Sequence, residues 1–238
     1  ALTAVCASVD VIIHAAGMNA QDSVAKPAEA LAFNGVATSH LLDAGCKARV
    51  KRIIYLSTAH VYGSPLEGTI TEETCARNLH PYATSHLAGE SVVLYATQRQ
   101  QIEGIVLRLS NAFGAPAHTE ANCWMLLVND LCRQAVNLRS MTLRSTGLQC
   151  RDFITLQDLS RVVAHMIDLS NKRIGNGLFN VGSGKSLRVI DMAELIQTRC
   201  TEVLGYTPQI IRPQATESEQ GSRLDYRIDK LIMTGFCL

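Results

Sequence analysis

The stretch "VKRIIYLSTAHVYG" (residues 50–63) joins an apolar run to a polar turn. Its first part, "VKRIIYLS" (Val50–Ser57), is rich in β-branched and aromatic side chains, which is typical of a strand buried on both faces of a sheet. The runs "VDVIIHAA" (Val9–Ala16) and "IEGIVLR" (Ile102–Arg108) also indicate strands. The sequence therefore predicts three buried strands, each followed by small or polar residues.

Helical patterns separate these strands. Within residues 27–46 apolar side chains recur every three or four positions, and Pro27 suits a first helical turn. A second helix is expected over about 81–98. Strands and helices that alternate at these lengths are typical of a parallel sheet with right-handed crossovers. The predicted fold class is therefore α/β, with a parallel sheet flanked by helices.

The alternation becomes less regular after residue 112. Further elements are predicted there: helices near 121–137, 156–170 and 189–204, and short strands at 139–145, 150–155, 177–182 and 207–212. No low-complexity linker separates the two parts. We therefore assign residues 1–112 to a sheet domain, to which residues 150–170 return, and residues 113–149 and 171–238 to a smaller α/β lobe.

Composition argues against several classes of protein. The chain of 238 residues has 22 Lys and Arg against 21 Asp and Glu, a formal charge of +1, so no surface for nucleic acid or an anionic membrane is indicated. No apolar run approaches the ~18–20 residues of a membrane span. The eight cysteines form no C-x-x-C pair and, like the histidines, show no metal-ligand spacing. Buried free thiols, no metal site and a cytoplasmic location are expected.

The residues that follow the predicted strands are candidates for a ligand site. In parallel sheets, ligands bind beyond the carboxyl ends of the strands. The first strand ends in "HAAG" (14–17), whose small residues permit close approach of a flat ligand. The next two strands offer the hydroxyls of Ser57 and Thr58 and the polar side chains of Ser110 and Asn111. We expect these groups to share one edge of the sheet.

The stretch "HPYATSHLAGE" (residues 80–90) places Tyr82 and His86 on one face of a helix. Thr58 and Tyr82 could share the oxygen of a bound alcohol or ketone, one polarising it while the other moves its proton. Taken singly, a threonine after a strand is more often a turn former, and a tyrosine more often a core residue. The ordered set favours the chemical interpretation.

Seven motifs resemble the extended short-chain dehydrogenase/reductase family, especially its nucleotide-sugar epimerases and dehydratases. In chain order they are "DVIIHAAG", "AFNGVATSHLLDA", "LSTAHVYG", "PYATSHLAGE", "LRLSNAFGAP", "LQCRDFITLQDL" and "FNVGSG". They span nearly the whole chain. The resemblance implies a Rossmann-type sheet that carries NAD, with NADP not excluded, and a C-terminal lobe for a nucleotide-linked sugar.

The resemblance also implies roles for individual residues. Thr58, Tyr82 and His86 would be catalytic, and His60, Asn111 and Arg151 would contact the substrate, with arginine suited to its phosphates. The cofactor would contact Tyr82, His86 and seven further residues: Ala15, Ala16, Gly17, Asn34, Ser57, Leu109 and Ser110.

The chain departs from the family pattern in two places. It has no glycine-rich pyrophosphate turn, so we interpret it as N-terminally truncated, without the first βαβ unit. His86 also stands where the family has a lysine that holds the nicotinamide ribose and lowers the pKa of the tyrosine. Because histidine is mostly neutral near pH 7, we expect a slow enzyme, or one more active at alkaline pH.

The predicted function is an NAD(P)-dependent epimerase or oxidoreductase that acts on a nucleotide-linked sugar through a transient ketone, with Tyr82 as acid and base. Ala59 and His60 stand where the dehydratase branch carries an acidic pair, which favours an epimerase or a simple reductase. The alternatives are an inactive relative that binds dinucleotide or nucleotide sugar, and a reductase of non-sugar carbonyls. A homodimer is expected through the tyrosine-bearing helix and its neighbour.

"GSGKS" (182–186) is interpreted as a turn that caps a helix, since Phe179 replaces the first glycine of a P-loop.

Overall fold

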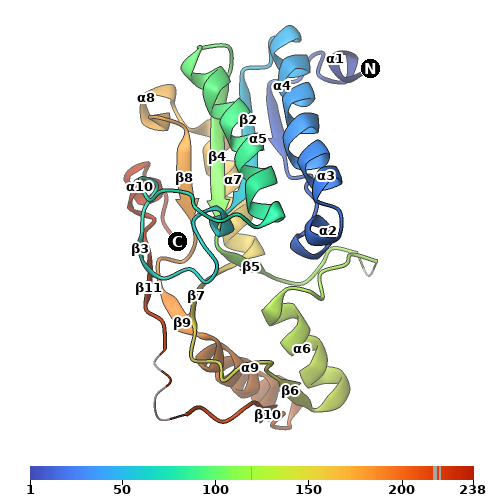
Figure 1. The fold of residues 1–238 in the computed structure, drawn as a ribbon, viewed down its shortest axis with the longest axis vertical. Helices are drawn as coiled ribbons and strands as arrows, with labels where there is room; N and C mark the ends of the chain where they lie inside the picture. Colours follow the sequence, from blue (N-terminus) through green and yellow to red (C-terminus); the bar gives the residue numbers. More distant parts are fainter. Residues whose placement is uncertain (119, 217–218, 220) are drawn as a thin grey trace.

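The structure is a computed structural model that describes residues 1–118, 120–216, 219 and 221–238. Four parallel strands form its main sheet in the order β1-β2-β4-β8 (Figure 1). The strands are β1 Val11–His14, β2 Arg52–Thr58, β4 Glu103–Leu109 and β8 Leu178–Val181.

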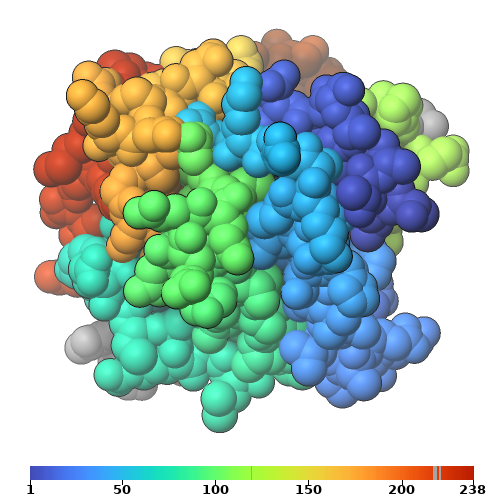
Figure 2. All heavy atoms as spheres, turned by 90° about the horizontal axis from the view of Figure 1, so that it is seen from above, coloured from blue at the N-terminus to red at the C-terminus, as the bar shows by residue number. Residues whose placement is uncertain are grey.

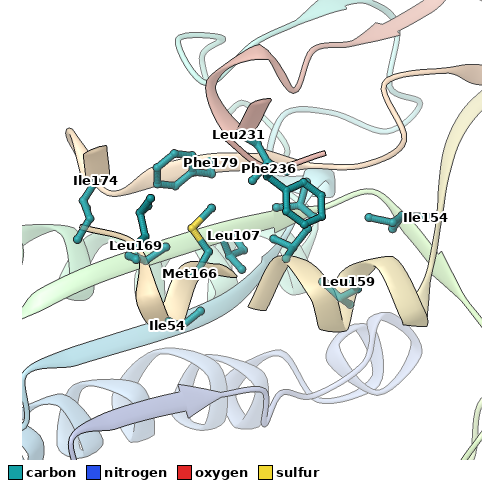
Figure 3. Packing of buried hydrophobic residues seen from close by; sticks show 13 residues of the cluster. Ile54, Leu107, Ile154, Leu159, Met166, Leu169, Ile174, Phe179, Leu231 and Phe236 are labelled. Carbon is teal, nitrogen blue, oxygen red and sulfur yellow. The ribbon is translucent and has the colours of Figure 1, made fainter. Parts of the chain in front are cut away.

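Three helices cover the two faces of this sheet, namely α4 Ala37–Lys47, α5 Pro81–Gln98 and α7 Leu156–Asp168. Successive strand residues point to opposite faces, so each strand contributes to two apolar cores. Ile53 and Tyr55 pack in the same core as Val93 of α5. Ile54 packs in the other core with Met166 of α7, as Figure 3 shows. Figure 1 accordingly shows α4 and α5 on one side of the sheet and α7 on the other.

A smaller lobe lies below the main sheet in Figure 1. Its two helices, α6 (Leu127–Leu138) and α9 (Val189–Leu204), pack around a core with the parallel strands β6 (Ser140–Thr142) and β10 (Gln209–Ile211). The side chain of Met141 is fully buried there. The lobe thus has an apolar core of its own.

Short elements connect the two parts. A three-stranded sheet has the order β5-β7-β9, and β3 pairs with β11. The strands are β3 Gly68–Ile70, β5 Asn111–Phe113, β7 Cys150–Thr155, β9 Ser186–Arg188 and β11 Leu224–Tyr226. The remaining helical segments are α1 Leu2–Val5, α2 Ala20–Ala25, α3 Pro27–Ala30, the π-helix η1 Leu31–Val36, the 3-10 turn η2 Ala59–Val61, α8 Asn171–Ile174 and α10 Asp229–Met233.

Two predicted helices differ from the observed ones. The helix expected across residues 27–46 is interrupted by the π-helical segment η1, which lies next to the predicted ligand edge; such segments are frequent at functional sites. The helix expected from residue 121 begins only at Leu127, because Leu126 is in an extended conformation with φ −76° and ψ 125°. The helices predicted over 81–98 and 189–204 have the observed bounds.

The strand β8 does not belong to the small lobe, where the sequence placed residues 171–238. It pairs with β4 from Val106↔Leu178 to Leu109↔Val181, so these residues are part of the main sheet. The physical reason is burial, because Phe179 and Val181 are fully buried in the core that α7 shares with the sheet.

The cysteines are mostly not buried, contrary to the prediction. All eight are free, but only Cys6 is buried, and Cys75, Cys132 and Cys237 are exposed. Within the described residues, no helix has the length and apolar character needed to cross a membrane. The same part of the chain contains no group of three or more metal-ligating side chains placed to hold an ion.

Candidate active site

The polar turn after β2 fixes Thr58 at the carboxyl edge of the main sheet. Its Oγ1 accepts a hydrogen bond from the backbone N–H of His60 at 3.1 Å and so caps the turn η2. The backbone carbonyl of His60 accepts another from Asn78 Nδ2 at 2.7 Å. This hydrogen bond uses a lone pair of the Thr58 oxygen, and the hydroxyl proton remains for a different acceptor.

Tyr82 lies in the first turn of α5. His80 caps this helix, since its Nδ1 accepts from the backbone N–H of Tyr82 at 3.2 Å, and Pro81 takes the first helical position, where no N–H is needed. Burial raises the pKa of the Tyr82 phenol above its ordinary value, although a hydrogen bond from the Thr58 hydroxyl opposes the shift. The phenol and the hydroxyl are therefore neighbours at the strand edge.

These two groups open into a cavity of about 400 Å³. The cavity lies where the main sheet meets the smaller lobe, and its walls come from both parts. It brings together eight of the predicted site residues, namely Ser57, Thr58, His60, Tyr82, Leu109, Ser110, Asn111 and Arg151.

Arg151 and His60 give this cavity its electrostatic character. The guanidinium of Arg151 has no ion pair or hydrogen bond with any residue that the structure describes, and burial lowers its pKa. The His60 imidazole is accessible from within the cavity, but the surrounding protein lowers its pKa, as do the nearby charges of Arg151 and His80. A cation without a partner at a cavity wall is suited to an anionic ligand.

A second group of residues lies on the β1 side of Tyr82. Asn34, fully buried in η1, accepts a hydrogen bond from the backbone N–H of Met18 at 2.7 Å and donates one to Ser85 Oγ of α5 at 2.9 Å. It thereby ties the turn after β1 to the tyrosine-bearing helix. A Cβ atom on Gly17 would lie 3.3 Å from Cε1 of His86, so the glycine permits close approach there.

His86 is 5% exposed and makes its hydrogen bond away from the cavity. Its Nδ1 lies 2.9 Å from the Tyr55 hydroxyl, and its ring meets the Tyr82 ring edge-on at 4.7 Å between centroids. Burial and, less strongly, the charge of His14 lower the pKa of His86 to about 4. The imidazole is therefore neutral near pH 7 and provides no cation beside the phenol.

Not all predicted cofactor residues lie at the cavity. Ala15 and Ala16 are exposed after β1 and are not among its lining residues. Ser57 lines it, but its hydroxyl donates to Glu90 Oε1 at 2.5 Å, beneath the site. Ser110 lines the cavity, and its buried hydroxyl has no hydrogen-bond partner within the described chain.

Sequence reasoning missed several residues of the site. The local pattern indicates for Tyr55 only a place in a strand, although it stands two residues before Ser57 and so shares its face of the sheet. Ala112 and Phe153 also line the cavity and lie within the quoted motifs, directly after Asn111 and two residues after Arg151, respectively. The other missed residues line it from segments with no local signal: Asn19, Ala20, Gln21, Met125, Leu126, Leu127 and Val128.

The segment "GSGKS" has a structural role. The buried carboxylate of Asp152 accepts hydrogen bonds from the backbone N–H groups of Ser183 at 2.8 Å and Lys185 at 3.2 Å, and from the Ser183 hydroxyl at 2.9 Å. A carboxylate of the chain thus takes the donors that a P-loop would present to a phosphate.

The sequence matches the NAD dependent epimerase/dehydratase family over residues 1–182. The match covers more than half of the chain, and the chain therefore belongs to this family. This confirms the family that the motifs indicated.

Characterised relatives of the chain include a dTDP-D-glucose 4,6-dehydratase from Bos taurus, which is 27% identical over 224 residues, covering 93% of this chain and 58% of the relative. A UDP-glucose 4-epimerase from Halalkalibacterium halodurans is 28% identical over 222 residues, covering 87% of this chain and 65% of the relative. The chain thus spans less than two thirds of the length of these relatives.

The fold is shared with solved structures. One is a UDP-N-acetylglucosamine 4-epimerase from Methanobrevibacter ruminantium M1 in complex with UDP-N-acetylmuramic acid, with a TM-score of 0.81 and 22% identity over 99% of this chain and 73% of that one. Another is MoeE5 in complex with UDP-glucose and NAD, with a TM-score of 0.77, 22% identity, and coverage of 99% and 76%. These similarities confirm the predicted Rossmann-type α/β fold.

Proposed function

We propose that this chain carries the catalytic edge of an NAD-dependent epimerase or oxidoreductase for a nucleotide-linked sugar. The observation that carries the proposal is the pair of Tyr82 and Thr58, which opens into the same cavity as the unpartnered guanidinium of Arg151. This cavity combines a proton-transfer pair with an anion site. The named relatives, dTDP-glucose dehydratases and UDP-glucose epimerases, support a nucleotide sugar as the substrate class.

The residues on the β1 side fit the nicotinamide-ribose part of NAD. A Cβ atom on Gly17 would lie 3.3 Å from Cε1 of His86, so the turn after β1 lies close to this ring, and the Ser110 hydroxyl is a buried polar group that still lacks a partner among the described residues. Asn34 holds the turn after β1 in place. When bound, NAD supplies the acceptor for a hydride from the sugar. NADP fits the same residues, because none of them would contact the phosphate that distinguishes the two.

Tyr82 and Thr58 perform the proton chemistry in this proposal. Thr58 donates a hydrogen bond from its hydroxyl to the substrate oxygen and polarises it, while the Tyr82 phenolate removes the proton of the sugar hydroxyl as it becomes a carbonyl. In the reverse direction the protonated phenol returns this proton. Because burial raises the pKa of Tyr82, the removal step gains most from alkaline pH.

The nucleotide diphosphate would occupy the side of the cavity next to the small lobe. Arg151 supplies bidentate donors for phosphate oxygens, and His60 lies next to it on the Tyr82 side. Asn111 lines the same wall while its Nδ2 donates to the Asp152 carbonyl at 2.8 Å, which holds β5 against β7. These residues would place the sugar between the phosphates and the phenol.

The experiment is to incubate the protein with NAD and a panel of UDP and dTDP sugars at pH 7 to 10, following absorbance of reduced cofactor and the products by NMR. We expect turnover that is abolished by Tyr82→Phe and retained by Tyr95→Phe, which alters an exposed tyrosine of the same helix. Binding of these ligands without turnover, in every variant, would show a non-catalytic binding protein.

A binding protein is the second candidate function, and the neutral His86 favours it. The phenol of Tyr82 has an uncharged ring at 4.7 Å where the family pattern has a lysine. A reductase of a carbonyl outside the sugars would use the same phenol and hydroxyl but would not need Arg151. Loss of turnover in Arg151→Met therefore separates a nucleotide-sugar enzyme from this third possibility.

We also propose that two copies of the chain pair through α4 and α5. Figure 2 shows the atoms of α4 (light blue) and α5 (green) side by side on one face of the molecule. A shallow groove between these helices is lined by Leu42, Val92 and Tyr95, and the side chain of Tyr95 is 62% exposed. Sedimentation of the wild type and of Tyr95→Glu tests this, since the charge would separate the copies.

A further inference from the structure

The two ring nitrogens of His86 face different surroundings. Nδ1 lies 2.9 Å from the hydroxyl of Tyr55, in the core between β2 and α5. On the opposite edge, a Cβ atom on Gly17 would lie 3.5 Å from Nε2, so this nitrogen faces the turn after β1. Nε2 has no hydrogen-bond partner among the described residues. Which nitrogen carries the proton therefore decides whether His86 offers a donor or an acceptor at this turn.

The hydrogen bonds around Thr38 restrict where protons can be. The Thr38 hydroxyl donates to the Asn34 carbonyl at 2.6 Å, which uses its only proton. His14 Nε2 lies 2.9 Å from the same Thr38 oxygen and must therefore be the donor of that contact. Thr38 can only accept from its remaining neighbours. It cannot supply a proton to Tyr55.

The Tyr55 hydroxyl keeps its own proton. The side chain is 1% exposed, and burial, followed by the charge of Glu90, raises the pKa of the phenol far above the neutral range. α5 comes close to this hydroxyl because residue 89 is a glycine, whose Cβ would lie 2.5 Å from the Tyr55 oxygen. The hydroxyl has two polar neighbours, namely His86 Nδ1 at 2.9 Å and the Thr38 hydroxyl, whose hydrogen bond lowers the pKa of the phenol.

We propose that Tyr55 is a positioning residue that donates to Nδ1 of His86 and so holds the imidazole as its Nε2–H tautomer. His86 then presents an uncharged N–H donor to the space beside Gly17. If the proposed function is correct, this donor meets a ribose oxygen of the nicotinamide half of NAD. The neutral histidine would thus retain the hydrogen bond, but not the charge, of a lysine at this position.

The tautomer is measured directly by long-range 1H–15N correlation of the histidine rings at pH 7.5, with His86 assigned by comparison with His86→Gln. We expect a protonated Nε2 and an unprotonated Nδ1 in the wild type, and a mixture in Tyr55→Phe. A protonated Nδ1 in the wild type would overturn the proposal, because Tyr55 would then accept from His86 and donate to the free lone pair of Thr38. The wild-type spectrum alone decides this point, even if the variant does not fold.

Calorimetric titration with NAD tests the consequence for the cofactor. An even mixture of tautomers halves the fraction of His86 that offers the donor, so Tyr55→Phe should bind NAD roughly twofold more weakly. Tyr226→Phe is the matched control, since Tyr226 is also 1% exposed but donates to the Arg108 carbonyl, away from His86. We expect Tyr226→Phe to bind as the wild type does.

The same titration in the His86→Lys background completes a double-mutant cycle. Since an ammonium donates without a tautomer, Tyr55→Phe should have no further effect on NAD binding there. An equal loss in both backgrounds would mean that Tyr55 acts through packing and not through the imidazole, which overturns the positioning role. If the wild type shows the Nε2–H tautomer but does not bind NAD, the tautomer assignment holds and the proposed function fails.

Discussion

Two arginines near strand ends differ in whether the guanidinium has a partner. Arg108 of β4, 5% exposed, contacts both carboxylate oxygens of Glu90, with Nη2 to Oε2 at 2.6 Å and Nε to Oε1 at 3.0 Å. Arg151, in the wall of the cavity, has no partner in the described part of the chain. Burial lowers the pKa of both guanidinium groups, but at Arg108 the hydrogen bonds and charge of Glu90 outweigh it.

The difference separates the framework of the site from its ligand surface. Glu90 also accepts from the Ser57 hydroxyl, and the Arg108 guanidinium lies 4.6 Å over the Tyr62 ring, so the network beneath the cavity is satisfied internally. The charge of Arg151 is compensated by nothing within the described residues and remains available. Removing one member of a buried ion pair leaves the other as an uncompensated charge, whereas removing an unpartnered charge breaks no ion pair or hydrogen bond.

The largest effect is expected from breaking the buried pair. Glu90→Gln keeps the shape of the side chain but leaves Arg108 as an uncompensated charge in the core, which should reduce the free energy of unfolding by about 3–5 kcal/mol. Urea denaturation at pH 7.5 measures this. Glu29→Gln, which breaks an exposed pair with Lys26, is the control and should change little. Equal losses of stability in the two variants would contradict the larger contribution of the buried pair.

The buried His86 is neutral near pH 7, and its contribution to the free energy of unfolding depends on pH. Its pKa is about 4 in the folded protein and about 6.5 in the unfolded chain, so the unfolded state binds more protons between these values. The stability it contributes is complete above pH 6.5 and is lost as the pH falls towards 4, in total about 3 kcal/mol. Urea denaturation at pH 7.5 and 4.5 should show a smaller loss for His86→Gln than for the wild type. Parallel losses in both proteins would refute this assignment.

The framework was more predictable from the sequence than the ligand surface. The strands around Ile54 and Val106 and the helix of Tyr82 follow from local patterns, because apolar periodicity and a proline at the first helical position act over a few residues. Thr58 and Tyr82 followed from the motifs, since Thr58 directly follows the predicted strand and Tyr82 lies in the first turn of the predicted helix.

The contacts between distant segments were not predictable. Tyr55 and His86 are 31 positions apart, and nothing in either local pattern indicates their hydrogen bond. The cavity wall formed by Leu126 and Val128 depends on how the small lobe sits against the sheet, which no local pattern specifies. β8 was assigned to the wrong part because its pairing with β4 is set by long-range burial of residues such as Phe179.

Removal of the unpartnered arginine is expected to weaken ligand binding without lowering stability. Arg151→Met keeps an apolar stem but no charge, so its stability should equal or exceed that of the wild type. Hydrogen bonds to charged groups are worth about 2 kcal/mol, so binding of UDP should weaken roughly 30-fold. Thermal melting and calorimetry measure the two quantities. Arg108→Met is the matched variant and should lose stability, because it leaves the buried carboxylate of Glu90 without a cation. Arg151→Met melting as low as Arg108→Met would show that Arg151 has a structural partner.

The smallest effect concerns the charge that His86 does not supply. In His86→Lys an ammonium would lie beside the Tyr82 phenol, and an opposite charge at this range lowers the pKa of a phenol by about one unit or more. Each unit raises the phenolate fraction tenfold below the pKa, so oxidation of a nucleotide sugar at pH 7.5 should be about tenfold faster, with the alkaline rise of the rate shifted to lower pH. His86→Gln offers a donor without a charge and should keep the wild-type pH profile. The rates of the three proteins between pH 7 and 10 therefore separate charge from hydrogen bonding at this position. If the lysine and glutamine variants give the same pH profile of the rate, the pKa of the Tyr82 phenol does not respond to charge at residue 86. The absence of a cation beside the phenol would then not limit the rate.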